Sequence, residues 1–394
     1  MTTPADCQAD VVICGGGVAG LWLLARLRQQ GYRALLIESE ALGAGQTRYA
    51  QGIIHGGTKY ALTGAVSGSS EAIAAMPPLW RACLEGHGEI DLRAVRLMSD
   101  HQYLWSTASI TSRMAGFFAS KMMRSRIAPL DAADYPAVFR HRNFRGQVYR
   151  LEEPVLDTAA LVHTLAQPHE SAIWRGRVVQ ADGLRLTLDD GGRQITIAAR
   201  QIVLTAGKGN AALLQLLGRD TPQMQTRPLK MVIVRGDLPQ GVYAHCLGAS
   251  SNPRITISTH YDAQGRTVWY LGGDLAEAGV KRSDAEQLAA ARQELGDLLP
   301  WIDFSACEFA TLDIDRAEPR MPDGRRPDDV YAEERGGVIT AWPTKLAFAP
   351  RLAARVADML KQKNIMPPVA MEDLPAWPFP GYALLPWQEE ERWS

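Results

Sequence analysis

Near the start of the chain, the pattern of apolar positions changes from that of a strand to that of a helix and back to that of a strand. Residues 10–14, DVVIC, form a short run rich in β-branched side chains, which is typical of a buried strand. Residues 21–27, LWLLARL, have a helical pattern, and residues 34–37, ALLI, predict a second strand. The sequence GGGVAG at 15–20 separates the first strand from the helix. This order predicts an α/β unit at the amino terminus.

Further elements are expected along the rest of the chain. They are a helix at 157–165, strands at 177–179 and 201–207 with a hairpin near 190–192, strands at 230–235, 254–259 and 267–271 with a turn at 262–265, and a helix at 283–299. Near the carboxyl end, a strand feeds a helix that we expect to begin near Pro343, because proline fits the first turn of a helix. We expect Pro350 to kink this helix.

The composition predicts a globular chain with more than one domain. Of 394 residues, 46% are apolar, and single cores stop growing near about 250–300 residues. Lys and Arg total 42 against 43 Asp and Glu, so the net charge of −1 argues against a nucleic-acid binder. The amino terminus has no positive flank, and no apolar run approaches the roughly 20 residues that cross a membrane. We therefore expect a soluble, cytoplasmic protein.

The five cysteines are odd in number and widely scattered, without a CxxC pair. This pattern predicts reduced thiols rather than disulfides, and no metal site. They are Cys7, Cys14, Cys83, Cys246 and Cys307.

The loop GGGVAG has the GxGxxG spacing of a dinucleotide-binding site. Gly15 permits a tight turn, Gly17 lets the backbone approach a pyrophosphate, and Gly20 lets the helix pack closely on the strand. The amino terminus of the helix offers its N–H groups to phosphate oxygens. The first helical residues after the turn are Val18 and Ala19.

Glu38 ends the second strand, and Ser39 follows it. A carboxylate at this place can accept hydrogen bonds from both ribose hydroxyls of an adenosine. FAD and NAD both contain adenosine, so the loop alone leaves both cofactors open.

Two later segments favour FAD. Residues 157–207 resemble the later part of a glutathione-reductase-type FAD domain, in which a valine such as Val178 presents its backbone to the adenine and a strand ending in Thr-Ala-Gly returns to the cofactor. In the carboxyl-terminal segment, a helix amino terminus aimed at the flavin would stabilise the negative charge that develops on reduction. The cofactor contacts expected from these segments are Ala206, Gly207, Gly337, Thr344, Lys345 and Leu346.

Together these segments resemble the FAD-dependent oxidoreductase superfamily that contains D-amino acid oxidase, glycine oxidase and glycerol-3-phosphate dehydrogenase. The resemblance implies an α/β fold, with a glutathione-reductase-type FAD-binding Rossmann domain, a second α+β domain with a large mixed β-sheet, and non-covalent FAD. It implies an FAD-binding domain at 1–70, 152–223 and 308–365, a substrate domain at 71–151 and 224–307, and a Pro- and Trp-rich tail at 366–394 that packs on the body.

The segment 51–62, QGIIHGGTKYAL, most resembles glycerol-3-phosphate dehydrogenase. In that family a histidine, two glycines, a basic residue and a tyrosine lie under the flavin. His55, Lys59 and Tyr60 fit this pattern, with lysine where the family usually has arginine. Further cofactor contacts are expected from Gln46, Thr47, Gln51 and Gly52.

The implied reaction transfers a hydride from a small anionic hydroxy or amino compound to flavin N5. Lys345 and Arg316, with Arg320 as the rival of Arg316, would bind the anionic group of the substrate. His55 is the first candidate for the base, since a neutral imidazole acts near physiological pH. His260 is the second, although its alternating polar strand favours a solvent-facing position.

Two other functions fit these residues, an NAD-dependent dehydrogenase and a flavin-binding protein without turnover. The substrate stays open, as does the electron acceptor, oxygen or quinone, and nothing requires more than a monomer. Residues 112–126 mix basic and apolar positions, which fits a membrane-surface helix, a lid over an anionic substrate, or a solvated helix packed on a sheet.

Overall fold

The computed structural model describes residues 6–57, 72–108, 127–248, 252–367 and 374–393. Within these residues the strands form two eight-stranded sheets and one two-stranded sheet. This architecture agrees with the predicted α/β fold that has a second domain with a large mixed sheet. No helix of the described segments is long and apolar enough to cross a bilayer.

The first sheet starts with the two strands that flank the glycine loop. They are β1 (Cys7–Cys14) and β2 (Ala34–Glu38), and helix α1 (Val18–Gln29) connects them. The other strands are β8 (Ile173–Arg175), β9 (Arg177–Asp182), β10 (Arg185–Asp189), β11 (Gln194–Leu204), β17 (Tyr331–Arg335) and β18 (Val338–Trp342). The order is β17-β18-β11-β1-β2-β8, with β10 and β9 attached to β11. The strands β18, β11, β1, β2 and β8 are parallel, so their carboxyl ends meet at one edge.

Helices cover both faces of this sheet. The helices α1, α7 (Thr158–Ala166) and α11 (Ala349–Gln362) share a core with one face, while α8 (Asn210–Leu216) packs on the other. The helix expected near Pro343 begins later, because the short 3-10 turn η7 (Leu346–Phe348) precedes α11. The predicted kink is also wrong, since Pro350 lies in the first turn of α11. A missing N–H there breaks no hydrogen bond within the helix.

The second sheet is mixed. Its strands are β4 (Gln102–Trp105), β5 (Ile127–Pro129), β6 (Val148–Leu151), β12 (Met224–Arg235), β13 (Tyr243–Cys246), β14 (Ile255–Tyr261), β15 (Thr267–Gly272) and β16 (Glu308–Pro319). The order is β16-β12-β15-β14-β13-β4-β6-β5, with β13 and β4 parallel. Helices α9 (Asp274–Gly279) and α10 (Asp284–Leu298) pack on it, and Ser283 and Glu286 form a capping box on α10.

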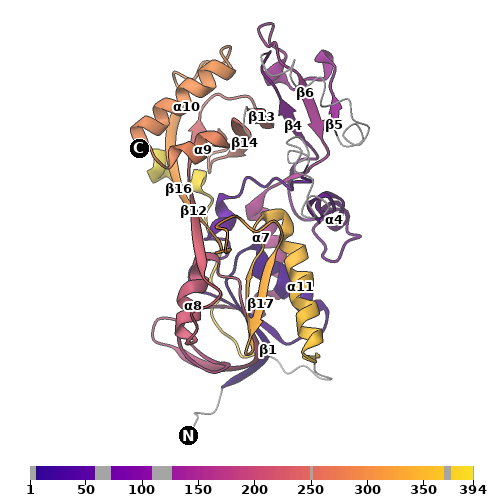
Figure 1. Ribbon diagram of the computed structural model, residues 1–394, viewed down its shortest axis with the longest axis vertical. Coiled ribbons are helices and arrows are strands. Elements are labelled where there is room, and N and C mark those ends of the chain that lie inside the picture. The colour runs from indigo at the N-terminus through magenta and orange to yellow at the C-terminus, as the bar shows by residue number, and fades with distance from the viewer. Residues whose placement is uncertain (1–5, 58–71, 109–126, 249–251, 368–373, 394) are drawn as a thin grey trace.

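The two long strands β12 and β16 pair along their whole length, from Met224 opposite Pro319 to Arg235 opposite Glu308. Figure 1 shows them running from the part of the molecule that contains α9 and α10 toward α8 and the first sheet. The expected boundary assigned 308–319 to the FAD-binding segments, whereas the pairing puts this strand in the second sheet. The sequence of a strand does not reveal its partner.

The described part of the carboxyl-terminal tail, 374–393, lies on the body of the molecule. Trp377 stacks on Trp174 of β8, with 5.6 Å between ring centroids. Trp387 stacks on His260 of β14, with 3.9 Å between ring centroids. The tail therefore contacts both sheets.

All five cysteines are buried, and none of them forms a disulfide. Burial, and to a lesser degree the negative charge of Glu38, raises the pKa of Cys14 to about 12. Burial likewise raises the pKa of Cys246 to about 12. These thiols stay protonated at neutral pH.

Candidate active site

The three glycines of the GxGxxG loop have different surroundings. Gly15 has a φ of +115°, and a Cβ on it would lie 2.5 Å from the Cα of Ala206. A Cβ on Gly20 would lie 2.0 Å from the carbonyl oxygen of Gly15. A Cβ on Gly17 would meet the Thr47 hydroxyl at 3.1 Å and, beyond its chain neighbours, no other described atom within 4 Å. The fold therefore needs Gly15 and Gly20, while Gly17 borders space for a ligand.

The amino terminus of α1 opens onto this space. Gly17 is the N-cap residue and has no side chain that could cap the helix. The Val18 N–H donates to the Thr47 hydroxyl over 3.1 Å. The N–H groups of a first helical turn have no acceptor inside their own helix, and the helix dipole favours an anion there. The turn formed by Val18, Ala19 and Gly20 is therefore suited to a pyrophosphate.

Glu38 lies against the same loop. One of its carboxylate oxygens accepts from the Gly16 N–H at 2.7 Å, and the other accepts from the Glu40 N–H at 2.9 Å. Burial raises the pKa of this carboxyl, and the two hydrogen bonds oppose the shift. Strand β8 pairs with β2 at Glu38, and β9, which carries the buried Val178, follows β8 directly. Glu38, Val178 and the exposed Ser39 thus lie at one end of the sheet, where an adenosine would fit.

The segment after β11 joins the loop to the end of β18. The Thr205 hydroxyl donates to the carbonyl oxygens of Cys14 and Gly15, both at 3.2 Å. Gly207 has a φ of +57°, and its carbonyl oxygen accepts from the Trp342 indole at 3.1 Å. The predicted cofactor residues of this Thr-Ala-Gly segment therefore lie beside the loop.

The segment after β2 extends from the loop to the second sheet. In the 3-10 turn η1 (Gln46–Tyr49), the Gln46 side-chain oxygen accepts from the Ala317 N–H of β16 at 2.9 Å. The Gln51 amide donates to the Ser258 hydroxyl at 3.2 Å and to the carbonyl oxygen of Tyr270 at 3.0 Å. Both predicted cofactor residues are therefore held by strands of the other sheet.

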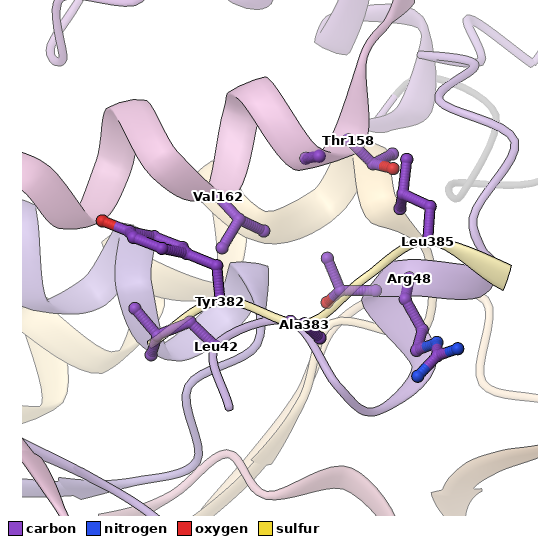
Figure 2. Close-up of a pocket in the computed structure, with 10 residues that line it drawn as sticks. Leu42, Arg48, Thr158, Val162, Tyr382, Ala383 and Leu385 are labelled. Atoms are coloured by element: carbon purple, nitrogen blue, oxygen red, sulfur yellow. The ribbon is translucent and has the colours of Figure 1, made fainter. Parts of the chain in front are cut away.

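A small pocket lies behind this segment, between η1, α7 and the tail. Figure 2 shows the tail passing between the helix that carries Thr158 and Val162 and the side that carries Leu42 and Arg48. The Leu42 N–H donates to Gly381 at 2.9 Å, and the Ala383 N–H donates to Leu42 at 3.0 Å. The residues that line the pocket are Leu42, Gly43, Thr47, Arg48, Thr158, Ala159, Val162, Tyr382, Ala383 and Leu385. The tail thus supports the wall that presents Thr47 to α1.

His55 lies against the second sheet, beside β13 and the segment that follows β6. Before it, Gly52 has a φ of +76°, and a Cβ on it would lie 2.0 Å from the carbonyl oxygen of Leu156. The Nδ1 atom of His55 is 3.5 Å from a carboxylate oxygen of Glu153. Its ring stacks on His245 of β13, with centroids 5.5 Å apart and an interplanar angle of 26°. The predicted histidine thus has an acidic neighbour and an aromatic one.

Sequence reasoning missed Glu153 and His245. Glu153 follows Glu152 immediately, and the sequence does not distinguish the buried member of this pair from the exposed one. His245 stands in the otherwise apolar YAHC of β13, and that unusual position was the one available signal. Their proximity to His55 depends on strand pairing across the second sheet.

Thr344 has a φ of +63°, which β-branched residues rarely adopt. Its hydroxyl donates to the carbonyl oxygen of Asp329 at 3.3 Å. Lys345 follows as the N-cap of η7, and its Nζ lies 5.1 Å from the ring centroid of Phe348. Strained backbone concentrates at ligand sites. The strain therefore supports a ligand contact by the segment that also contains Leu346.

Arg316 is half-buried on β16 and lies among other charges. Its Nε donates to the carbonyl oxygen of Arg227 at 3.2 Å. Burial lowers its pKa, and the positive charges of Arg326 and Arg227 act in the same direction. The buried carboxylate of Glu318 is 3.4 Å from Arg227 Nε and 3.8 Å from Arg326 Nε, and Glu277 acts on Arg316 from α9. Three guanidinium groups against two carboxylates leave an excess of positive charge.

Three other predicted substrate-binding residues are Arg320, Lys59 and Tyr60. The rival Arg320 is exposed, and its N–H donates to Gln223 at 2.8 Å at the end of the β12–β16 ladder. Lys59 and Tyr60 lie outside the described residues.

Two predictions are wrong. Gly337 lies in the turn from β17 to β18, at the opposite end of β18 from the glycine loop. A hairpin glycine and a cofactor glycine look alike in sequence.

His260 does not face solvent, because Trp387 covers it and leaves it 5% exposed. Burial lowers the pKa of His260 to about 3, so it is neutral at physiological pH.

Comparison with known protein families identifies the chemistry that this site serves. The family described as FAD dependent oxidoreductase matches residues 10–344. The chain is 48% identical over 389 residues to the probable FAD-dependent oxidoreductase PA4991 of Pseudomonas aeruginosa, covering 98% of this chain and 99% of that protein.

Solved structures agree in fold. The crystal structure of PA4991 from Pseudomonas aeruginosa superposes with a TM-score of 0.85 and 44% identity, over 98% of this chain and 99% of that one. Glycine oxidase from Geobacillus kaustophilus has a TM-score of 0.65 at 18% identity, over 93% and 100% of the chains. Glycerol-3-phosphate dehydrogenase from Bacillus halodurans, solved with FAD, has a TM-score of 0.62 at 15% identity, over 92% and 66%. The chain therefore belongs to the DAO family of FAD-dependent oxidoreductases, and its cofactor is FAD.

Proposed function

We propose that this enzyme oxidises a small anionic compound at a carbon that bears a hydroxyl or an amine. The observation that carries the proposal is the 2.9 Å hydrogen bond from the Ala317 N–H to the Gln46 side chain. It fixes the strand that bears Arg316 directly against η1, a segment that we expect to contact the cofactor. A guanidinium group in this position can bind a carboxylate or phosphate through two hydrogen bonds.

The residues have distinct proposed roles. Bound FAD supplies the acceptor for a hydride. Arg316 holds the anionic group, and Lys59, Tyr60 and Lys345 complete the substrate contacts. His55 takes up the proton that leaves the hydroxyl or amine, because it lies on the segment that continues from Gln51 and Gly52.

The site lies between two proposed domains. The FAD-binding domain contains the first sheet, and the substrate domain contains the second sheet, including β12 and β16. With FAD as the cofactor, the alternative of an NAD-dependent dehydrogenase falls away.

The test is a donor screen under anaerobic conditions. The purified protein is mixed with matched pairs of hydroxy and amino compounds that differ only in carrying a carboxylate, a phosphate or a neutral group, and loss of flavin absorbance is followed. We expect anionic donors to bleach the flavin and neutral analogues to fail. Equal bleaching by neutral analogues would contradict the proposal. Readmission of oxygen or a quinone to the reduced protein then identifies the acceptor.

A matched pair of arginine variants checks the anion site. Arg316→Ala should weaken binding of the anionic donor by roughly 10–100-fold, because hydrogen bonds to charged groups contribute about 1.5–3 kcal/mol. Flavin content should stay unchanged. Arg320→Ala is the control, since Arg320 is exposed, and it should bind the donor like the original protein. Loss of flavin in Arg316→Ala would show that Arg316 serves the cofactor instead.

A further inference from the structure

A buried carboxylate lies beside the proposed base. Glu153, between β6 and β7 (Val155–Leu156), has a side chain that is 5% exposed, and one of its oxygens is 3.5 Å from the Nδ1 atom of His55. Gln102 of β4 is fully buried and donates its amide to the same carboxylate oxygen. A buried carboxylate that stays charged requires hydrogen-bond donors and a nearby cation. His55 becomes such a cation when it takes up a proton.

The His55 ring has one buried and one open side. Its Nδ1 atom is buried, although 23% of the side chain is exposed. The exposed fraction therefore belongs to other atoms of the side chain than Nδ1. With its Nδ1 proton held toward the carboxylate, the ring keeps the lone pair of Nε2 for a substrate.

Gly56 creates the room that this arrangement needs. A Cβ on Gly56 would lie 3.1 Å from the other carboxylate oxygen of Glu153 and 3.0 Å from the ring of Pro77 in α4 (Met76–Leu84). Both distances are too short for an unstrained methyl contact. The glycine that follows His55 in the sequence thus lets the carboxylate pack against the backbone.

The second ring that contacts His55 is itself fixed. His245 is 2% exposed, and its Nδ1 atom is 2.7 Å from the Thr256 hydroxyl. Strand β13, which carries His245, pairs with β4 on one side and β14 on the other. The imidazole of His55 therefore has a rigid stacking surface in addition to its acidic neighbour.

We propose that Glu153 is a positioning residue that holds His55 with its proton on Nδ1 and stabilises the imidazolium that forms during turnover. This inference rests on the proposed role of His55 as the proton acceptor. In the step concerned, the O–H or N–H bond of the substrate breaks and its proton forms a bond to Nε2. The electron pair of the broken bond stays on the oxygen or nitrogen. His55 then carries one positive charge beside the carboxylate of Glu153.

The first test is spectroscopic and needs no substrate. Protein labelled with 15N-histidine is prepared as the original chain and as Glu153→Gln, and the His55 signals are assigned by their loss in His55→Phe. We expect the original protein to show a protonated Nδ1 and an unprotonated Nε2 on His55 near neutral pH. Glu153→Gln should lose this preference. Unchanged His55 nitrogen shifts in Glu153→Gln would overturn the proposal.

The second test uses a donor found in the anaerobic screen. Glu153→Gln should slow flavin reduction by roughly 100-fold, the usual contribution of a positioned base, without changing the affinity for the donor. Glu153→Asp, which keeps the charge, should recover part of this loss. Glu294→Gln is the control. Glu294 lies on α10 and pairs with Arg254, so its substitution removes a carboxylate without touching His55, and the rate should stay unchanged. A normal rate in Glu153→Gln would overturn the proposal.

A further variant covers the case in which Glu153→Gln does not fold. Gly56→Ala keeps every charge but crowds the Glu153 carboxylate, so it should produce the same change in the His55 signals and the same loss of rate. Normal His55 signals in folded Gly56→Ala would count against Glu153. If no donor bleaches the flavin, the proposed function fails, while the nitrogen shifts still decide the role of Glu153.

Discussion

At the scale of single residues, the glycines of the GxGxxG loop have two different roles: one allows close packing of the fold, and another leaves space for a ligand. Gly20 packs against the carbonyl of Gly15 so closely that a methyl group would overlap it. Gly17 has φ −77° and ψ 177°, an extended conformation that any residue adopts, and a Cβ on it would approach only the Thr47 hydroxyl, at 3.1 Å. Gly20 is therefore needed for folding, whereas Gly17 is expected to be needed for ligand binding.

This difference predicts opposite results for two similar substitutions. Gly17→Ala should destabilise the FAD-free protein by only about 1 kcal/mol, because only the Thr47 hydroxyl has to shift, yet weaken FAD binding at least tenfold. Gly20→Ala should destabilise the fold by several kcal/mol through overlap. Urea denaturation of the FAD-free proteins and flavin fluorescence titration measure the two effects. Tight FAD binding by Gly17→Ala would show that the pyrophosphate lies elsewhere.

Sequence alone predicted the strand–loop–helix geometry of this loop because its parts are close along the chain. Strand, glycines, helix and Glu38 lie in one short segment, and local spacing determines their relation. The environment of His55 was not predictable, because Glu153 and His245 reach it through strand pairs that join distant segments. Gly337 was misassigned for the related reason that glycine marks any backbone with positive φ.

At the scale of elements, the carboxyl-terminal tail covers one face of β14. The alternating pattern of that strand predicted a solvated face, and the tail converts this face into an interior one. Trp387 covers His260, while Glu389 pairs with Arg48, and Glu390 pairs with Arg235 at 3.1 Å. The His260 Nε2 atom lies 2.9 Å from the Ser258 hydroxyl, which also accepts from Gln51. The tail thus stabilises the side of the site from which Gln51 extends.

The burial of His260 predicts a pH-dependent stability. Its pKa is about 3 in the folded protein against an ordinary value of 6.5, so the unfolded chain binds the proton more readily. Its contribution is fully present above pH 6.5 and decreases, by up to about 1.4 kcal/mol per pH unit, as the pH falls from 6.5 toward 3. Urea denaturation of the original protein and His260→Phe between pH 7.5 and 4.5 measures this slope. The variant keeps the stacked ring and should show a shallower loss.

A second histidine with a lowered pKa, the half-buried His169, provides the control. Burial lowers the pKa of His169 to about 4, and this residue lies in the 3-10 turn η5 (Gln167–Ala172) rather than under Trp387. His169→Phe should also reduce the slope, but the tryptophan fluorescence that reports release of Trp387 should respond to acid as in the original protein. Equal slopes in the original protein and His260→Phe would mean that His260 takes up protons equally in the folded and unfolded states.

At the scale of the whole molecule, the residues that we expect to contact FAD are held by two sheets that have separate cores. The loop after β1 and the Thr-Ala-Gly segment belong to the first sheet, whereas Gln46 and Gln51 are bonded to strands of the second. A ligand held by both sets of residues binds only when both sheets are in place. Cofactor binding and the relative position of the sheets are therefore coupled.

This coupling predicts a large stabilisation by the cofactor. FAD at about 1,000 times its Kd should add about 4 kcal/mol to the free energy of unfolding and raise Tm by roughly 5–10 °C. Calorimetry of the FAD-free and FAD-loaded protein measures the shift, and NAD at the same concentration is the control that should give none. Two separate transitions that persist at saturating FAD would show that the sheets unfold independently.

The burial of Cys14 affects how readily its thiol can be oxidised. Cys14 is the residue immediately before the glycine loop, and its thiol has a pKa of about 12. Thiolates, rather than thiols, attack disulfides and react with peroxide. Cys14 therefore offers no reactive thiolate at the glycine loop near neutral pH. We expect its sulfur atom to stay reduced during repeated turnover in air.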